Sequence, residues 1–290
     1  MAPRKASSRP PLTSPLPSEP VPTTTGTVEL VPDPSAPRAF TLMLDGVPSS
    51  HVDLDDPEHL EFEYMQQMAA VLDRLGEPRS ALEVVHLGGA GCSMARYVHA
   101  TRPRSRQVAV EIDELLAQHV RGWFELPRSP ALRIRVGDAR AVLASMPDAS
   151  ADVVIRDVFA DAETPGHLVT AEFTSEVRRV LRAGGVYLAN CADRPPLALA
   201  RSEVATVREV FGVVVLTAEP AQLRGRRYGN LVIAASDSAE VLTGAGLARA
   251  IRSLPAPTRL LEGRELDELV GAAPVLRDPS EPPAPPPMAG

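Results

Sequence analysis

Residues 82–111 decide the fold, and they read LEVVHLGGAGCSMARYVHATRPRSRQVAVE. An apolar run meets three glycines within four positions, Gly88, Gly89 and Gly91. A segment of helical character follows, and then a second apolar run that ends at Glu111. This order predicts a β-strand, a tight turn, a crossover helix and a parallel strand, which together open a nucleotide-binding α/β sheet.

The acid at the end of this unit indicates the ligand. Glu111 lies 23 residues after Gly88, close to the ~20 residues that place a carboxylate where it accepts hydrogen bonds from ribose hydroxyls. A dinucleotide turn would need G-x-G-x-x-G, but Ala90 and Ser93 occupy the second and third glycine positions. An adenosyl sulfonium carries no phosphate, so it needs only a short glycine turn and a ribose acid. The alternative is a tight turn in an unrelated α/β domain.

The two ends of the chain are rich in proline, and together they hold 14 of its 30 prolines. Such segments bury too little apolar surface to offset the loss of chain entropy. We therefore expect disordered tails over residues 1–26 and 274–290. Between them, residues 27–56 are predicted to form a small N-terminal β domain, and residues 57–273 a Rossmann-like nucleoside-binding domain.

Composition argues against several classes of function. The net charge is −7 and aromatic residues make up 4%, so nucleic acid is a poor partner. No run approaches the ~20 apolar residues of a membrane span, and prolines interrupt the segment after Arg9 where a signal peptide would be apolar. We expect a cytoplasmic protein. Cys92 and Cys191 offer neither a disulfide framework nor a zinc spacing, and no metal is expected.

Strands and helices alternate along the chain. Residues 27–53 alternate in polarity as strands do, with Asp45 and Gly46 as a hairpin turn. Asp56 before Pro57 predicts the start of a helix over residues 57–75. Further helices are predicted at 113–122, 139–145, 170–182, 195–211, 246–254 and 265–270, and strands at 132–136, 152–155, 186–190, 213–216 and 230–235. The alternation predicts a mostly parallel sheet whose last strand is antiparallel.

Polar residues end several of these strands, at the edge where such sheets bind ligands. Besides Glu111, they are Asp138, Asp157 and Asn190. Asp138 precedes a helix, so it either caps that helix or accepts a hydrogen bond from an adenine amino group, and both interpretations remain open.

Asp157 opens a loop, VFADAETPGHL, that contains two further acids, Asp161 and Glu163. The proline-glycine pair in this loop disfavours regular structure. A mobile acidic loop over a nucleoside site predicts a cationic second substrate, with these two acids among its contacts.

Several motifs in their order resemble those of the spermidine synthase family of aminopropyltransferases, most closely its short bacterial relatives. They are LMLDG (42–46), LGGAG (87–91), VEID (110–113), GDA (137–139), DVFADAETPGHL (157–168) with TAEF after it, LRAGGVYLAN (181–190) and RRYGNLVIAAS (226–236). The resemblance implies a Rossmann-like S-adenosylmethionine-dependent methyltransferase fold with a small N-terminal β domain. It also implies decarboxylated S-adenosylmethionine as donor, a diamine acceptor and a homodimer or homotetramer.

Carried over by position, the resemblance assigns roles to single residues. The donor would be held by Gly88, Gly89, Gly91, Glu111, Asp138 and Ala139. Asp157 would be the catalytic residue, because a carboxylate that positions the attacking amine and accepts its proton lowers the barrier. Tyr64 and Tyr228 match aromatic positions that line the acceptor groove.

The chain also departs from the family pattern. Ala160 stands where the loop usually has a second aspartate, Met65 where a histidine follows the tyrosine, and Ser49 near the position of a glutamine. We hypothesise that the acceptor, or the activity itself, has changed. Three classes remain open: an aminopropyltransferase, a methyltransferase that uses intact S-adenosylmethionine, and a non-catalytic adenosyl-binding relative.

Overall fold

The N-terminal part of the chain forms a four-stranded antiparallel sheet in this computed structural model, which describes residues 15–160 and 163–279. Its strands, in spatial order, are β1 (Val21–Pro22), β2 (Thr27–Pro32), β3 (Ala39–Leu44) and β4 (Val47–Asp53). Asp45 and Gly46 connect β3 to β4 with φ angles of 46° and 79°. A two-residue hairpin turn requires such positive angles, and the predicted hairpin is confirmed.

The N-terminal sheet begins earlier than the sequence predicted. β1 lies within residues 1–26, which were expected to be a disordered tail, and it pairs with β2. The backbone N–H groups of Thr24 and Thr25 donate to the carboxylate of Asp113 at 3.0 and 2.8 Å. These contacts attach residues 21–26 to the folded part. Residues 1–14 lie outside the described residues.

The C-terminal end also extends further than predicted. Leu276 accepts a hydrogen bond from the N–H of Ala171 at 2.9 Å and donates one to the hydroxyl of Thr206 at 2.8 Å. Residues 274–279, here named the C-terminal strap, therefore bind across two helices and are not part of a tail. The remaining residues of the predicted tail, 280–290, lie outside the described part of the chain.

The main sheet has eight strands in the order β12-β10-β11-β9-β8-β5-β6-β7. They are β5 (Glu83–Leu87), β6 (Arg106–Glu111), β7 (Leu132–Val136), β8 (Ala151–Arg156), β9 (Leu181–Asp193), β10 (Val213–Ala218), β11 (Gly229–Ser236) and β12 (Arg259–Leu261). The five strands from β9 to β7 are parallel, whereas β11 inserts antiparallel between β9 and β10. This arrangement confirms the predicted mixed α/β fold, although β12 was not predicted.

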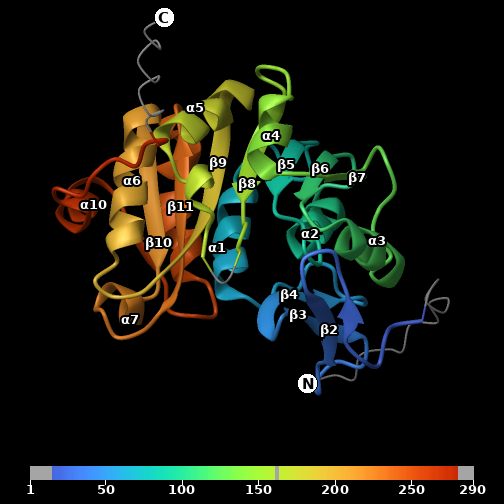
Figure 1. The fold of residues 1–290 in the computed structure, drawn as a ribbon. Coiled ribbons are helices and arrows are strands. Elements are labelled where there is room, and N and C mark those ends of the chain that lie inside the picture. Colours follow the sequence, from blue (N-terminus) through green and yellow to red (C-terminus); the bar gives the residue numbers. More distant parts are fainter. Residues whose placement is uncertain (1–14, 161–162, 280–290) are drawn as a thin grey trace, which may run out of the picture.

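Helices cover both faces of the main sheet (Figure 1). One face packs against α4 (Ala139–Ala144), α5 (Ala171–Val180), α6 (Ala198–Val210) and α10 (Gly263–Val270). The other packs against α1 (Glu63–Leu72), α2 (Ser93–Thr101), α8 (Ala239–Leu242) and α9 (Ala245–Arg252). A third core joins the N-terminal sheet to α3 (Glu114–Trp123). No helix among the described residues is long and apolar enough to cross a membrane.

Two predicted boundaries are wrong for physical reasons. The helix expected from residue 57 begins only at Glu63, because the carboxylate of Asp56 accepts from the N–H of Glu58 and closes a turn instead. The helix predicted over residues 170–182 also ends early, at Val180, and the strand predicted over 186–190 begins early. β9 starts at Leu181 and runs through both glycines, and a Cβ at Gly185 would lie 3.0 Å from the Asp152 carbonyl oxygen of β8. Glycine there permits the backbones to approach closely where the register between β8 and β9 shifts.

Candidate functional site

The glycine turn after β5 is shaped by close contact with the end of β8. Gly88 has a φ of 92°, and a Cβ at this position would lie 2.0 Å from the carbonyl oxygen of Asp157. The N–H of Asp157 in turn donates to the carbonyl of Leu87 at 2.8 Å. Only glycine meets both the positive φ and the close approach. The turn and Asp157 therefore lie at the same carboxyl edge of the sheet.

Glu111 is held against this turn from the end of β6. Its Oε2 accepts hydrogen bonds from the N–H groups of Gly89 at 3.1 Å and Ala90 at 2.9 Å. Its Oε1 accepts from the N–H of Asp113 at 3.0 Å. A carboxylate offers about four acceptor sites, so three backbone donors orient the group and leave capacity for a hydroxyl.

Asp138 caps α4, which is one of its two predicted roles. Its Oδ1 accepts from the N–H of Ala141 at 2.9 Å, while its Oδ2 lies 2.9 Å from Nε2 of His167. Partial burial alone would raise the pKa of Asp138, but the hydrogen bonds from Ala141 and His167 outweigh it and hold that pKa below its usual value. Ala139 follows as the buried first residue of α4. Sequence reasoning missed His167, although it lies in the quoted loop.

An exposed apolar patch lies beside Glu111, and the sequence analysis did not identify it. Ile112 is 60% exposed, Leu115 is 40% exposed and Val136 is 49% exposed. Val136 is paired with Glu111 across β6 and β7. Large apolar side chains left open at a ligand-binding edge provide a surface for a flat ring to pack on.

Asp157 is hydrogen-bonded by two neutral side chains from two other elements. Its Oδ2 accepts from the hydroxyl of Tyr64 on α1, and its Oδ1 accepts from the amide of Asn190 on β9, both at 2.9 Å. Burial raises the pKa of Asp157, while Asn190, Tyr64 and the charge of Arg156 oppose that rise. Burial, together with the charge of Asp157, also raises the pKa of Tyr64 well above its usual value, so the phenol remains a donor.

The side chain of Asn190 has a second polar group that is suited to binding a ligand. Its Oδ1 is buried, and among residues 15–160 and 163–279 it has no hydrogen-bond donor. Because a buried acceptor without a partner is costly, it suits a ligand that brings an N–H group. The sequence had identified Asn190 only as the polar end of a strand.

Glu163, a predicted site residue of the acidic loop, makes its hydrogen bonds with the backbone of Ala160. Ala160 and Glu163 exchange backbone hydrogen bonds at 2.9 and 3.0 Å, and Glu163 is exposed. Tyr228 is 53% exposed. Its partial burial is the largest cause of a raised pKa, and nearby acids that include Glu163 raise that pKa further. Neither Glu163 nor Tyr228 is hydrogen-bonded to Asp157 in the described structure. Asp161 lies outside the described residues.

A small hollow of about 70 Å³ opens beside Tyr64. Its lining includes two carboxylates, Glu63 and Glu219, and one cation, Arg227, which is ion-paired with Glu219. The excess negative charge favours a cationic group.

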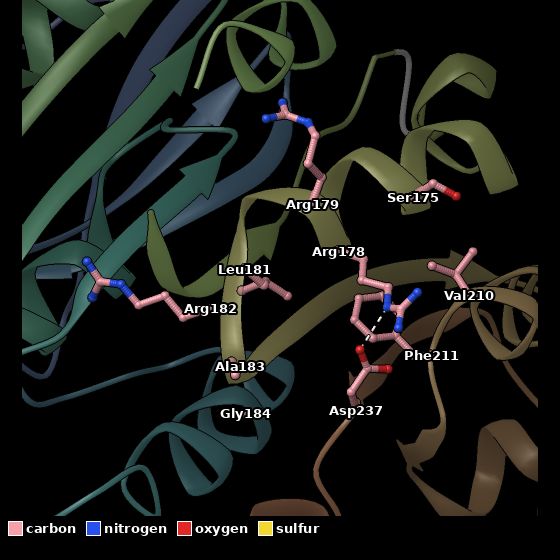
Figure 2. A pocket seen from close by; sticks show the side chains of 11 residues that line it. Ser175, Arg178, Arg179, Leu181, Arg182, Ala183, Gly184, Val210, Phe211 and Asp237 are labelled. Carbon is pink, nitrogen blue, oxygen red and sulfur yellow. Dashed lines mark hydrogen bonds and ion pairs between the residues drawn. The ribbon is translucent and has the colours of Figure 1, made fainter. Parts of the chain in front are cut away.

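A larger hollow, of about 450 Å³, lies at the opposite, amino edge of the sheet (Figure 2). There Arg178 points to Asp237 at 2.7 Å, and Arg179 and Arg182 turn toward acids outside the hollow. Its arginines are therefore already neutralised.

Of the residues that depart from the family pattern, Met65 has a clear structural role. Met65 is a residue of α1, and its side chain is buried in the core between α1 and the sheet. Ser50, the neighbour of Ser49, accepts a hydrogen bond from the N–H of Gly91 at 3.0 Å. Burial raises the pKa of the Cys92 thiol to about 12, which makes a reactive thiolate unfavourable.

The fold and the site define the class: an α/β protein with a methyltransferase-type sheet and acids gathered at its carboxyl edge. A probable spermidine synthase from Corynebacterium glutamicum is 37% identical, with a TM-score of 0.85, and the match covers 94% of this chain and 100% of that chain. The chain therefore belongs to the spermidine synthase family of polyamine aminopropyltransferases.

Two further comparisons set the limits of this assignment. The polyamine aminopropyltransferase of Vibrio vulnificus is 31% identical over 161 residues, which are 54% of this chain and 52% of that protein. The chain thus spans about half the length of the curated relatives it matches. Human methyltransferase-like protein 13, crystallised with SAH, is 24% identical with a TM-score of 0.53 over 67% of this chain and 95% of that chain, and shares the fold alone. No family model matches the chain.

Proposed function

We propose that this protein transfers an aminopropyl group from decarboxylated S-adenosylmethionine to a diamine of the putrescine type and releases methylthioadenosine. One observation carries the proposal: Asp157 is held by Tyr64 and Asn190 directly beside the glycine turn to which Glu111 is attached. A base and a ribose acid at one sheet edge are what a reaction between an amine and a nucleoside requires.

Asp157 acts on the acceptor amine. With a lysine-like pKa near 10.4, exposing the amine lone pair at pH 7 costs roughly 4–5 kcal/mol. Asp157 takes this proton, and the raised pKa of Asp157 makes it a stronger base. Tyr64 holds one carboxylate oxygen, while the free Oδ1 of Asn190 accepts a second N–H of the amine and orients its lone pair.

The donor supplies an electrophilic propyl carbon attached to a sulfonium. A C–N bond forms as the C–S bond breaks, sulfur keeps the electron pair, and the amine proton passes to Asp157. Glu111 holds a ribose hydroxyl through its remaining acceptor capacity. The adenine packs on the patch of Ile112, Leu115 and Val136, with Asp138 and Ala139 at its edge.

The far end of the acceptor carries a second ammonium group. The acidic hollow beside Tyr64 suits such a cation. Glu163 and Tyr228, which lie close enough for the Glu163 carboxylate to raise the pKa of Tyr228, form the outer part of the same groove in this proposal.

Calorimetry with decarboxylated donor, intact S-adenosylmethionine and methylthioadenosine tests the donor. We expect tightest binding of the decarboxylated donor or of methylthioadenosine. A clear preference for intact S-adenosylmethionine would instead favour a methyltransferase. Incubation with putrescine and related diamines then tests the reaction, with methylthioadenosine as the expected product. Binding without any product at high protein concentration would favour a non-catalytic relative.

A further inference from the structure

Arg156, the last residue of β8, is fully buried although arginine is rarely found in a protein core. Its Nη2 lies 2.6 Å from Oε1 of Glu203 on α6, which is 1% exposed. Burial opposes the charge of Arg156, but Glu203 outweighs it and raises the pKa of Arg156. A buried ion pair of this kind is often no more stabilising than an apolar pair of the same size. Stability alone therefore does not explain why both charges are present.

The guanidinium of Arg156 joins the two segments that border Asp157. Its Nη1 donates to the carbonyl of Leu168 at 2.9 Å, and its Nη2 donates to the carbonyl of Asn190 at 2.8 Å. Leu168 is where the loop that starts at Asp157 returns to the fold, and the Asn190 side chain holds Asp157 itself. Arg156 projects to the face that carries α6, whereas Asp157 is held from α1 on the other face.

We propose that Arg156 is a positioning residue: from the opposite face of the sheet, it fixes the carbonyls of Asn190 and Leu168 so that Asn190 and the loop hold Asp157 in its working position. This inference rests on the proposed role of Asp157 as the base. Only a planar guanidinium group, with several N–H donors, can contact two carbonyls and a carboxylate at the same time. Glu203 balances the charge that this geometry brings into the core.

The charge of Arg156 has a second consequence. It opposes the rise in the pKa of Asp157 that burial causes, and the other groups that act on Asp157 are Asn190 and Tyr64. Glu203 is not among the groups that act on the pKa of Asp157, so removing Arg156 together with Glu203 should still raise that pKa. A role confined to packing would not produce this change.

The test replaces the pair by apolar residues in the double variant R156M/E203L, which avoids leaving one charge buried alone. We expect kcat to fall by up to ~100-fold, as for small displacements of catalytic groups. Nucleoside affinity should stay within twofold, and the acid limb of the kcat/KM profile should move to higher pH. A folded double variant with wild-type kcat and an unchanged acid limb would overturn the proposal.

Arg102 supplies a matched control. It is also buried and donates to the carbonyls of Leu72 and Ser80, away from Asp157. R102M should lower the thermal midpoint without moving kcat or the pH profile, and an equal loss of kcat in R102M would contradict a specific role for Arg156. If the double variant does not fold, R156K takes its place. It keeps the cation but not the fork, so its kcat should fall with an unchanged acid limb, and wild-type kcat would reject the proposal.

A readout without turnover separates this inference from the proposed function. The pKa of Asp157 can be followed by NMR of ¹³C-labelled aspartate carboxyls, with D157N to assign the signal. If the wild-type protein produces no methylthioadenosine, the proposed function fails. A higher Asp157 pKa in R156M/E203L would still support the link to Arg156, and an unchanged pKa would reject it.

Discussion

At the scale of the residue, Asp157 depends on two neutral donors and has no second carboxylate in contact with it among the described residues. Tyr64 and Asn190 each hold one of its oxygens, and Ala160 stands where the family pattern has another aspartate. Both donors lie at positions that the sequence analysis had marked, Tyr64 by its match to an aromatic position of the family and Asn190 as a strand end. Their convergence could not be read from the sequence, because it depends on how α1 packs against the sheet.

Asp157→Asn should abolish turnover, because an amide cannot accept the amine proton. Affinity for methylthioadenosine should remain within a few fold, since Glu111 and the glycine turn are unaffected. Product formation and calorimetry on the same preparation check both expectations. Turnover at the wild-type rate would remove Asp157 from the mechanism.

The pH dependence of turnover follows from the burial of Asp157, which raises its pKa. The base works only when deprotonated, so activity should be lost as pH falls through that raised pKa. The acid limb of kcat/KM should therefore lie above ~3.9, the ordinary value for an aspartate. A limb at or below the ordinary value, in a protein that is still folded, would contradict this account.

Glu111→Ala should weaken nucleoside binding by about 1.5–3 kcal/mol, the scale for hydrogen bonds to a charged group. Glu111 also accepts from Gly89 and Ala90, so part of the loss would come from a looser turn. Glu111→Gln keeps one acceptor oxygen for the turn and is the matched variant. Calorimetry with methylthioadenosine measures both variants, and unchanged affinity in the alanine variant would place the ribose elsewhere.

At the scale of the element, local signals predicted best where capping or a tight turn decides the boundary. Asp113 caps α3 at the predicted start of that helix, because its side chain accepts from the N–H of Leu116, and β7 has the predicted bounds. Prediction failed at two boundaries. A local turn at Asp56 delays the start of α1 to Glu63, and β9 runs through two glycines at the point where its register with β8 shifts.

Asp113→Ala tests how the N-terminal sheet is attached to α3. Burial would raise the pKa of Asp113, but hydrogen bonds from Leu116, Thr25 and Thr24 outweigh it and lower that pKa. The stability that Asp113 contributes is therefore present above ~3.9 and is lost as pH falls through the lowered pKa. We expect a loss of about 1–3 kcal/mol at pH 7 in urea unfolding. No loss at pH 7 would contradict the assigned contacts.

At the scale of the whole molecule, the gathering of these acids at one edge could be predicted because parallel strands bring their carboxyl ends together. Glu111, Asp138 and Asp157 are far apart in sequence, yet all end or follow neighbouring strands. The sequence could not show His167 against Asp138, or Arg156 beneath Asn190, because both contacts cross between elements that no local pattern connects. The C-terminal strap was missed because its prolines indicated disorder.

Removing the C-terminal strap should destabilise the protein. Leu276 is hydrogen-bonded to Ala171 and Thr206, and Asp278 is ion-paired with Arg140, which also donates to the His167 carbonyl. A chain that ends at residue 273 should therefore unfold at a lower temperature than one that ends at residue 279. Equal thermal midpoints for the two truncations would show that these contacts contribute nothing.

The central claim is that one adenosyl donor and one amine meet between Glu111 and Asp157. A crystal structure of the protein with methylthioadenosine and putrescine tests it most directly. We predict a ribose hydroxyl on the Glu111 carboxylate and an amine nitrogen within hydrogen-bond distance of both Asp157 and Oδ1 of Asn190. A nucleoside bound away from the glycine turn, or an amine without contact to Asp157, would contradict the account.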